Sequence, residues 1–509
     1  MKKAISIGIQ GFSALREQDC FFVDKTNFIK EWWENRDVVT LITRPRRFGK
    51  TLNMSMLECF FSNKYANRAD LFEGLSIWQE EAYRKLQGSY PVIFLSFAAV
   101  KAGNLEDAKT QIKQEIARLY RENRNLMKED IFGEDERELY YQTTVKMDDV
   151  TAQDSLRNLS EWMERYYGKK VIILLDEYDT PMQEAYVQGY WDEFTAFVRS
   201  LFNASFKTNP YLERAIMTGI TRVSKESIFS DLNNLQVITT TSDLYADCFG
   251  FTESEVFHVL DEFGMGDKKD EVKQWYDGFT FGEHKDIYNP WSITNYLDKR
   301  KTYPYWASTS SNGLVSRLIR TASADVKEKM EDLLNGREIV VSFDEQIVYN
   351  QLDHNENAIW SLLLASGYLK VKHVDYRGIT REPWYTLDIT NIETLSMFTT
   401  MFQDWFQNQD ANYGYFMKAL INGDLEAMNY YMNKVALATF SYFDVGSGNG
   451  SDPEPERFYH GFVLGLIAER AGIYEIRSNR ESGFGRYDIM MIPQEREKYP
   501  AIIIEFKVC

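Results

Sequence analysis

The sequence lacks the cysteine and histidine patterns that hold metals or build disulfide frameworks. Its five histidines show no zinc-like spacing, and its four cysteines include no C-x-x-C pair: Cys20, Cys59, Cys248 and Cys509. Nor does the basic N-terminus lead into a long apolar segment, so we find neither a signal peptide nor a membrane span. We therefore expect a protein of the reducing cytoplasm that makes no contact with a membrane.

The sequence also has fewer basic than acidic residues. Lysine and arginine number 58 against 76 aspartate and glutamate residues, which gives a formal net charge of −18. A chain this acidic has no global attraction to nucleic acid, so any contact with DNA must be local. Core-forming residues are plentiful, because 44% of the chain is hydrophobic and 15% is aromatic. A chain of 509 residues should form about three domains.

One stretch has the order of elements that a phosphate-binding loop requires. An apolar, β-prone run from Val38 to Ile42 leads into a basic turn, which is followed by Gly49-Lys50-Thr51 and a helical run that begins near Leu52. At such a helix N-terminus, backbone N–H groups point at an anion and the helix dipole adds partial positive charge. Gly49 lets the backbone approach the phosphates, Lys50 reaches the β/γ oxygens, and the Thr51 hydroxyl can ligate Mg²⁺.

The match departs from the usual G-x-x-x-x-G-K-[ST] pattern at one position. The first glycine of the pattern is replaced by Arg44, and three arginines and a proline fill a loop that is usually small and flexible. The alternative interpretation is a basic turn in front of a helix.

A second stretch supports the first. Residues 171–175 form a continuous apolar run, which suits a strand buried on both faces of a parallel sheet, and Asp176 and Glu177 follow directly. Carboxylates at the end of such a strand would lie beside the phosphate-binding loop. Asp176 can hold Mg²⁺ directly or through water, and Glu177 can polarise the attacking water. A core strand capped by surface acids is the alternative.

Two further runs, 91–97 and 214–221, are also strand-like, and helical patterns lie between the strands. This alternation predicts an α/β fold with a parallel sheet flanked by helices, which binds its ligand at the carboxyl edge of the strands. Thr218, Thr221 and Arg222 fall at that edge. A polar residue there can sense the γ-phosphate, and Arg222 can neutralise developing charge, in cis or on a neighbouring subunit; loop-end packing is the alternative.

The rest of the chain falls into three parts. Residues 251–335 are expected to form a helical lid subdomain. Residues 336–445 are expected to form a helical unit with a hairpin, similar to a winged helix, to which we assign no DNA binding because its basic residues are sparse and mixed with acids. A polar, Gly-rich linker at 446–453 separates this unit from a last segment, 457–509.

The last segment carries a second group of charged residues with a catalytic spacing. Glu505 and Lys507 are two residues apart in a strand, so their side chains share one face, and a paired strand can bring Asp488 beside them. Two carboxylates can hold Mg²⁺, and the ammonium can orient or activate water for attack on a phosphodiester. Acids and lysines also alternate on many solvent-facing strands, which is the alternative.

Several motifs together resemble the bacterial AAA-ATPase-like family, whose members often carry a C-terminal PD-(D/E)XK nuclease-like domain. They lie at residues 24–26 (DKT), 44–51 (RPRRFGKT), 175–179 (LDEYD), 218–222 (TGITR), 249–253 (FGFTE), 275–279 (WYDGF), 288–293 (YNPWSI) and 305–310 (YWASTS). RPRRFGKT is the usual phosphate-binding loop of that family, so Arg44 agrees with the resemblance. The resemblance implies a module that binds and hydrolyses ATP with Mg²⁺, and it implies that the nucleotide is bound by Arg46, Arg47, Phe48, Gly49, Lys50 and Thr51.

The resemblance extends to the C-terminal segment. Asp488, Glu505 and Lys507 stand at the positions of the PD-(D/E)XK motif, and Glu469 matches its upstream acid. It implies that Glu469, Asp488 and Glu505 ligate Mg²⁺ and that Asp488, Glu505 and Lys507 cleave nucleic acid. A domain of this class normally continues with a helix and another strand, so we expect the segment to be incomplete.

We therefore predict a P-loop NTPase domain at 1–250, followed by the lid at 251–335, the helical and winged-helix-like unit at 336–445 and the nuclease-like segment. ATP hydrolysis would control a nuclease that acts on DNA through the C-terminal segment. Two other classes stay open: a nucleotide-dependent signalling or scaffold switch whose nuclease-like segment is inactive, and a small-molecule phosphotransferase. A homo-oligomer is compatible with each of them.

Overall fold

A computed structural model describes residues 3–128, 131–222, 228–229, 232–309, 313–334, 336–345, 349, 352, 355–407, 412–431, 463, 467, 473–482 and 485–505. The chain divides into two compact units, Met1–Thr309 with Val340–Glu393 and Ser310–Ile339 with Thr394–Cys509. The four-part domain scheme given above stays a prediction.

The first unit is built on a five-stranded sheet. Its strands stand in the order β2-β3-β4-β1-β5, and every neighbouring pair is parallel. They are β1 (Val39–Thr43), β2 (Val92–Ser96), β3 (Val171–Asp176), β4 (Leu212–Gly219) and β5 (Leu235–Ile238). The predicted α/β fold is confirmed, together with its four predicted strands. Strand β5 was not predicted, because four residues with a polar position among them give too short a pattern.

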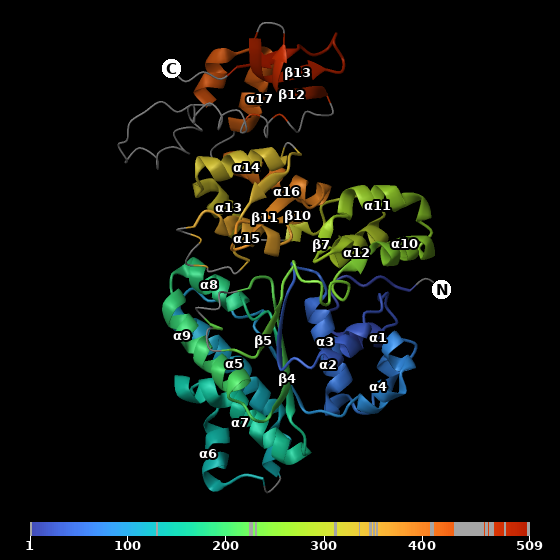
Figure 1. The fold of residues 1–509 in the computed structure, drawn as a ribbon, viewed down its shortest axis with the longest axis vertical. Helices are drawn as coiled ribbons and strands as arrows, with labels where there is room; N and C mark the ends of the chain where they lie inside the picture. The colour runs from blue at the N-terminus through green and yellow to red at the C-terminus, as the bar shows by residue number, and fades with distance from the viewer. Residues whose placement is uncertain are drawn as a thin grey trace. The chain divides into compact units, whose positions relative to one another are not determined.

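Helices cover both faces of this sheet (Figure 1). One group comprises α1 (Phe12–Glu17), α2 (Asn27–Asn35), α3 (Lys50–Phe61) and α4 (Glu81–Leu86). The other comprises α5 (Leu105–Glu122), α6 (Glu134–Gln142), α7 (Asp149–Tyr167), α8 (Thr180–Gln188) and α9 (Trp191–Phe202). The long helices begin at side chains that accept from their first turns: Asn104 from Asp107 N and Asp148 from Thr151 N.

The core between the sheet and α2 and α3 fixes the position of α3. Alternate strand residues, including Ile42, Ile172 and Ile216, pack against Leu57 and Phe60 of α3 in one buried cluster. Each fully buried side chain of this size stabilises the fold by about 1.5–3 kcal/mol. The N-terminus of α3 is therefore held rigidly at the carboxyl edge of the sheet.

Residues 251–309 combine helices with a small antiparallel sheet. Strand β8 (His284–Tyr288) pairs with both β6 (Phe251–Thr252) and β7 (Phe279–Phe281). The helices are α10 (Glu253–Glu262), α11 (Lys269–Tyr276) and α12 (Pro290–Lys299). The sequence pattern predicts only helices here, because strands this short leave almost no alternation to detect.

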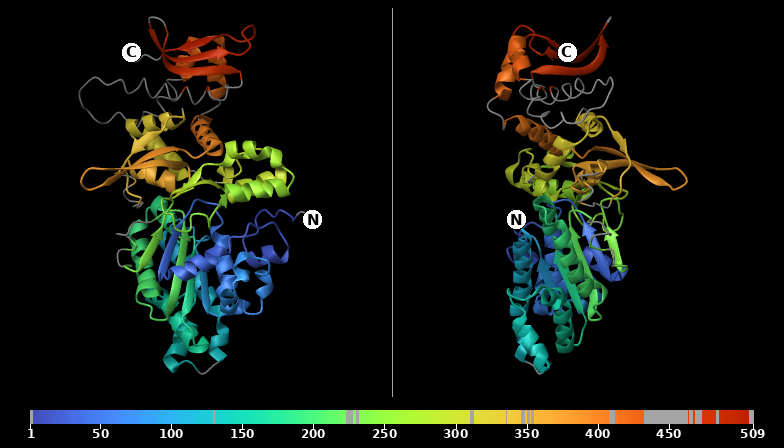
Figure 2. Two further views of the ribbon diagram at one scale, coloured as in Figure 1. Left: turned by 45° about the vertical axis from the view of Figure 1, so that its right-hand side comes forward. Right: turned by 90° about the vertical axis from the view of Figure 1, so that its left-hand side faces the viewer.

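Residues 340–393 contribute the helix and hairpin that the sequence predicts. Helix α15 (Ala358–Ala365) precedes the antiparallel strands β10 (Leu369–Arg377) and β11 (Glu382–Ile389). Strand β9 (Ile339–Val341) adds to β11 on its other side. The tip of the hairpin extends away from the rest of its unit (Figure 2).

The second unit contains a three-stranded antiparallel sheet and helices. The strands, in the order β12-β13-β14, are β12 (Tyr474–Ser482), β13 (Gly485–Pro493) and β14 (Ile502–Ile504). Its helices are α13 (Gly313–Thr321), α14 (Ala324–Leu334), most of α16 (Ile392–Gln407), and α17 (Asn412–Asn422). One face of the sheet, with Ile489, Met491 and Ile504, packs against Phe416 and Leu420 of α17. The predicted linker at 446–453 lies outside the described residues.

None of the helices in the described part of the chain has the length and the apolar composition needed to cross a bilayer.

A buried carboxyl group joins three segments of the first unit. Glu393 is 0% exposed and accepts hydrogen bonds from Ser292 Oγ, at 2.8 Å, and from Trp306 N, at 2.6 Å. Burial raises the pKa of Glu393 to about 7. The motifs that contain Ser292 and Trp306 are thus explained in part by packing around one acid.

Glu393 makes the stability of the first unit depend on pH. The pKa of Glu393 is higher in the folded than in the unfolded state, so ionisation of this group destabilises the fold. The loss in the free energy of unfolding is absent below about pH 4.5 and grows to roughly 3 kcal/mol as the pH rises through 7. Glu393→Gln should therefore unfold at a higher temperature than the wild type at pH 8 and at nearly the same temperature at pH 5. Thermal unfolding between these values tests this, with the exposed Glu134→Gln as control. Parallel profiles for wild type and Glu393→Gln would contradict it.

Candidate nucleotide site

The loop between β1 and α3 ends in a backbone conformation suited to an anion. Gly49 is the N-cap residue of α3 with φ +80°, and no side chain caps this helix. The backbone hydrogen bonds among the described residues include none donated by the N–H groups of Gly49, Lys50 or Thr51. A Cβ built on Gly49 meets nothing within 4 Å. Backbone donors left without an acceptor at a helix N-terminus fit a phosphate group.

Lys50 lies inside this loop. Its side chain is buried, and Nζ donates to the carbonyl oxygens of Arg44 and Pro45, each at 2.9 Å. Burial lowers the pKa of Lys50, and the negative charges of Glu177, Asp179 and Asp176 oppose that fall. The ammonium is thus held by its own loop, within the field of three carboxylates.

Asp176, at the end of β3, meets the loop across one intervening strand. Its Oδ2 accepts from Thr51 Oγ1 at 2.7 Å, and its Oδ1 accepts from Thr218 Oγ1 of β4 at 2.5 Å. Burial raises the pKa of Asp176, while the hydrogen bonds from Thr218 and Thr51 oppose the rise. A hydroxyl and a carboxylate this close offer the oxygen ligands that Mg²⁺ prefers, so the residues fit this ion.

The two acids after Asp176 have different surroundings. Glu177 is partly buried, has φ +51°, and accepts from Thr180 Oγ1 at 3.2 Å. A positive φ at a non-glycine residue costs free energy, and such residues cluster at functional sites. Asp179 is buried and accepts from the backbone N–H groups of Ile220 and Thr221 and from Thr221 Oγ1.

Gly219 is required by this arrangement, because a Cβ there would lie 2.7 Å from Asp179 Oδ1 and from the Tyr178 ring. Tyr178 donates from its hydroxyl to the Thr221 carbonyl at 2.8 Å. The motif at 218–222 is therefore bonded to the motif at 175–179. The strand pattern predicts Thr218 and Thr221 at this edge but not Asp179, whose only signal in the sequence is its place in the LDEYD motif.

A second residue that the sequence analysis missed is Tyr349. It is buried, and its hydroxyl lies 3.1 Å from Thr221 Oγ1. Its ring packs beside Tyr186 of α8 and Trp191 of α9, with ring centroids 5.4 Å apart in each pair. No motif marks this residue, since the contact joins positions 128 apart in the chain.

Arg44 has a structural role that could not be predicted from its position in the loop. It is 0% exposed, and its guanidinium donates to the carbonyl oxygens of Thr43, Thr239 and Tyr245, among others, and lies 4.4 Å from the Phe281 ring centroid. Burial lowers the pKa of Arg44 to about 9, so the group stays charged at neutral pH. It ties the loop to the segment that follows β5.

Two other loop side chains pack against residues 251–309. The Phe48 ring lies 4.7 Å from that of Phe279 and 5.4 Å from that of Phe281, and the Arg47 guanidinium lies 4.4 Å from the Trp291 ring. Nucleotide binding by Arg46, Arg47 and Phe48 stays a prediction. Because the side chains of Arg47 and Phe48 pack against aromatic rings, these two residues would bind a nucleotide through their backbone groups.

Arg222 is partly buried and lies in a small pocket at the same sheet edge. The pocket is lined by Thr43, Arg222, Thr239, Thr240, Phe343, Glu345, Ser361, Leu364 and Ala365. Glu345 accepts from the hydroxyls of Thr239, Thr241 and Tyr385 at 2.6–3.0 Å. The predicted catalytic role of Arg222 stays a prediction.

The motif at 24–26 clamps three segments of the first unit together. Asp24 Oδ2 accepts from the N–H and the hydroxyl of Ser76, and Lys25 Nζ donates to the Glu255 carboxylate and to the Asp247 carbonyl. Burial opposes ionisation of Asp24, but the hydrogen bonds from Ser76 and Thr26 outweigh it and lower the pKa.

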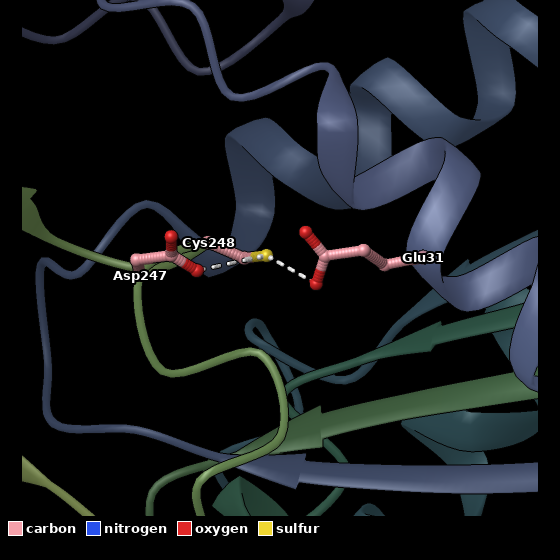
Figure 3. Close-up of side chains that lie close together, drawn as sticks. All are labelled: Glu31, Asp247 and Cys248. Carbon is pink, nitrogen blue, oxygen red and sulfur yellow. Dashed lines mark hydrogen bonds between the residues drawn. The ribbon is translucent and has the colours of Figure 1, made fainter. Parts of the chain in front are cut away.

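Next to this clamp lies a group of potential metal ligands, Glu31, Asp247 and Cys248 (Figure 3). The Cys248 thiol donates to Glu31 Oε2 at 3.5 Å and lies 3.9 Å from Asp247 Oδ1. Burial raises the pKa of the Cys248 thiol well above its ordinary value, so it stays protonated and acts as a donor. We interpret the group as a hydrogen-bonded packing contact.

In the C-terminal segment, the register brings two predicted site residues to one face. Ile489 pairs with Ile504 in the antiparallel ladder, so Asp488 and Glu505 are the next residues opposite each other. They lie on the face opposite to the buried Ile489 and Ile504. Asp488 is partly buried and Glu505 is exposed. Glu469 and Lys507 lie outside the described residues.

A parallel sheet with a Gly-Lys-Thr loop at the N-terminus of α3, and a carboxylate bonded to the threonine after the loop lysine, is the arrangement of a P-loop-type α/β domain. Residues 6–229 match the family described as predicted AAA-ATPase, and residues 454–509 match the PD-(D/E)XK nuclease superfamily. These two matches confirm the resemblance: one region of the chain is similar to the AAA-ATPase-like family and its C-terminal segment to the nuclease superfamily.

The chain is also similar to an uncharacterized protein in the vnfD 5′ region of Azotobacter chroococcum mcd 1. The two are 27% identical over 398 residues, which cover 77% of this chain and 68% of the relative. The alignment is longer than the two family matches together, so it includes part of the region between them.

Removal of the Arg44 side chain should destabilise the first unit. Arg44→Ala leaves several buried carbonyl oxygens without a donor, so we expect a loss of about 3–5 kcal/mol in the free energy of unfolding. Urea unfolding measures this loss. Arg47→Ala, which removes one exposed cation–π contact, should cost about 1 kcal/mol or less. Equal stability of Arg44→Ala and wild type would contradict the structural role of Arg44.

Proposed function

We propose that this chain binds ATP at the loop before α3, hydrolyses it with Mg²⁺, and couples the hydrolysis to a nuclease-like domain that acts on DNA. The observation that carries the proposal is the hydrogen bond between Thr51 and Asp176 at the end of the anion-binding loop. Lys50, the oxygen atoms of Thr51 and Asp176, and Glu177 lie near one another at one edge of the sheet, which supports the proposal.

The backbone and the side chains of the site have separate tasks in this proposal. The N–H groups of Gly49, Lys50 and Thr51 bind phosphate oxygens, and Lys50 moves its ammonium from the carbonyl oxygens of its loop to the phosphates. Thr51 and Asp176 hold Mg²⁺, which neutralises phosphate charge when bound. Asp179 keeps Thr221 oriented at the sheet edge, where its hydroxyl can sense the terminal phosphate.

The hydrolytic step balances with Glu177 as the base. Glu177 accepts a proton from a water molecule whose oxygen forms a bond to the terminal phosphorus. The bond from that phosphorus to the bridging oxygen breaks, and ADP leaves with the electron pair. An acid beside Asp176 suits activation of water rather than capture of an organic acceptor, which favours hydrolysis over phosphotransfer to a small molecule.

The nuclease half of the proposal rests on the shared face of Asp488 and Glu505. Two opposed carboxylates can ligate Mg²⁺, and Lys507 follows Glu505 at the spacing of the family motif. With a net charge of −18, the chain must bind DNA through local contacts in this segment.

Two substitutions test the ATPase. Lys50→Ala should abolish ATP binding or turnover, because the buried cation that meets the phosphates is lost. Glu177→Gln should bind ATP with wild-type affinity but hydrolyse it at least about 100-fold more slowly. Phosphate release and nucleotide titration measure both effects. Wild-type turnover in either variant would refute the role assigned to that residue.

A third substitution tests the nuclease. Asp488→Asn should lower Mg²⁺-dependent DNA cleavage at least about 100-fold while ATP turnover is retained, because the change removes one metal-binding charge without altering side-chain size. Glu495→Gln, an exposed acid beyond β13, is the matched control. If the wild type does not cleave DNA at all, the alternative of a nucleotide-dependent switch with an inactive nuclease-like segment is favoured.

A further inference from the structure

The phosphate-binding loop contains three arginines, and two of them are already engaged. Arg44 is buried and donates to backbone carbonyl oxygens behind the loop. Arg47 stacks on Trp291. The third, Arg46, is partly buried, and its guanidinium makes no hydrogen bond, ion pair or ring contact with any residue in the described part of the chain.

Arg46 is nevertheless held in place through its backbone. Its carbonyl oxygen accepts from Asn289 Nδ2 at 3.3 Å. The preceding carbonyl, that of Pro45, accepts from Lys50 Nζ at 2.9 Å. The backbone of Arg46 is thus fixed on both sides, next to the lysine that meets the phosphates, while its side chain remains unengaged.

The charge of Arg46 acts on two groups at the sheet edge, Lys50 and Tyr349. Burial is the main cause of the lowered pKa of Lys50, and the positive charge of Arg46 contributes. Burial raises the pKa of Tyr349, and Arg46 opposes that rise. Tyr349 in turn lies 3.1 Å from Thr221 Oγ1, which is bonded to Asp179. Arg46 is therefore near Lys50 and Tyr349, and Tyr349 contacts the threonine that Asp179 holds.

An unpaired, partly buried guanidinium costs free energy unless an anion compensates it. Lys50 already lies in the field of three carboxylates, so it alone leaves much of the charge of a triphosphate unbalanced. The planar guanidinium can bind two phosphate oxygens at once. Arg222 is placed differently, since its pocket contains the carboxylate of Glu345.

We propose that Arg46 is the catalytic arginine of this site and binds the terminal phosphate of ATP within the same chain. This inference rests on the proposed ATPase function. As water attacks the terminal phosphorus and the bond to the bridging oxygen breaks, Arg46 stabilises the negative charge on the transferred group, and no proton passes to or from it. The site then needs no arginine from a second subunit.

The test compares Arg46→Ala and Arg46→Lys with wild type in the full chain. Arg46→Ala should lower kcat about 10³-fold, in the range known for such arginines. It should weaken ATP binding less than about 10-fold and leave ADP binding unchanged. Arg46→Lys should recover only part of kcat, because lysine keeps the charge but loses the two-point contact.

The readout that does not depend on activity is binding of ADP with aluminium fluoride, a mimic of the transferred phosphoryl group. Calorimetry should show that wild type binds this mimic far more tightly than ADP alone, and that Arg46→Ala binds the two equally. The exposed Arg377→Ala, whose guanidinium stacks on Trp384 in the hairpin, is the matched control and should behave as wild type.

Three results separate the possible failures. Wild-type kcat and mimic binding in Arg46→Ala, with turnover lost in Lys50→Ala, would overturn the role of Arg46 and leave the ATPase intact. Loss of mimic binding in Arg222→Ala instead would assign that role to Arg222. Absence of ATP binding and turnover in the wild type would refute the proposed function itself. If Arg46→Ala folds poorly, Arg46→Gln replaces it in the same measurements.

Discussion

The organisation of the first unit depends on the hydrogen bond between Thr51 and Asp176. A helix N-terminus and a strand C-terminus meet there, so the orphan donors of α3 face the acids that follow β3. Packing of α3 on the sheet fixes one partner, and the parallel ladder of β3 and β4 fixes the other. Burial makes each charge at this edge costly by itself, and an anion with Mg²⁺ would balance them together.

Around this edge, residues 340–393 are bonded to the sheet at two points. Glu345 accepts from Thr239 and Thr241 after β5, and Tyr349 meets Thr221 after β4. These contacts link the hairpin segment to the strand ends where nucleotide chemistry is proposed. A shift of Thr221 would strain its hydrogen bond with Tyr349. A structural change at the proposed phosphate site could therefore be transmitted to residues 340–393.

Four of the five strands and the strand–loop–helix order around Gly49-Lys50-Thr51 could be predicted from the sequence, because buried parallel strands are continuous apolar runs and because Gly49-Lys50-Thr51 is a local pattern. The position of Asp176 at the end of a strand could also be predicted, since this residue follows a continuous apolar run. The short strands β5 to β8 could not be predicted, because two to five residues carry no usable periodicity. The opposed positions of Asp488 and Glu505 agree with the spacing argument, while the roles of all the site residues remain predictions.

The sequence by itself determined the α/β class, the loop and the acids at the strand ends, since these are encoded by neighbouring residues. Only the tertiary structure decided what each loop arginine contacts. Arg44, Arg46 and Arg47 are chemically identical and lie within four positions, yet one is buried behind the loop, one stacks on Trp291 and one is left unengaged. The partners that separate them come from positions some 200 residues away, and no local pattern records which partner a side chain will meet.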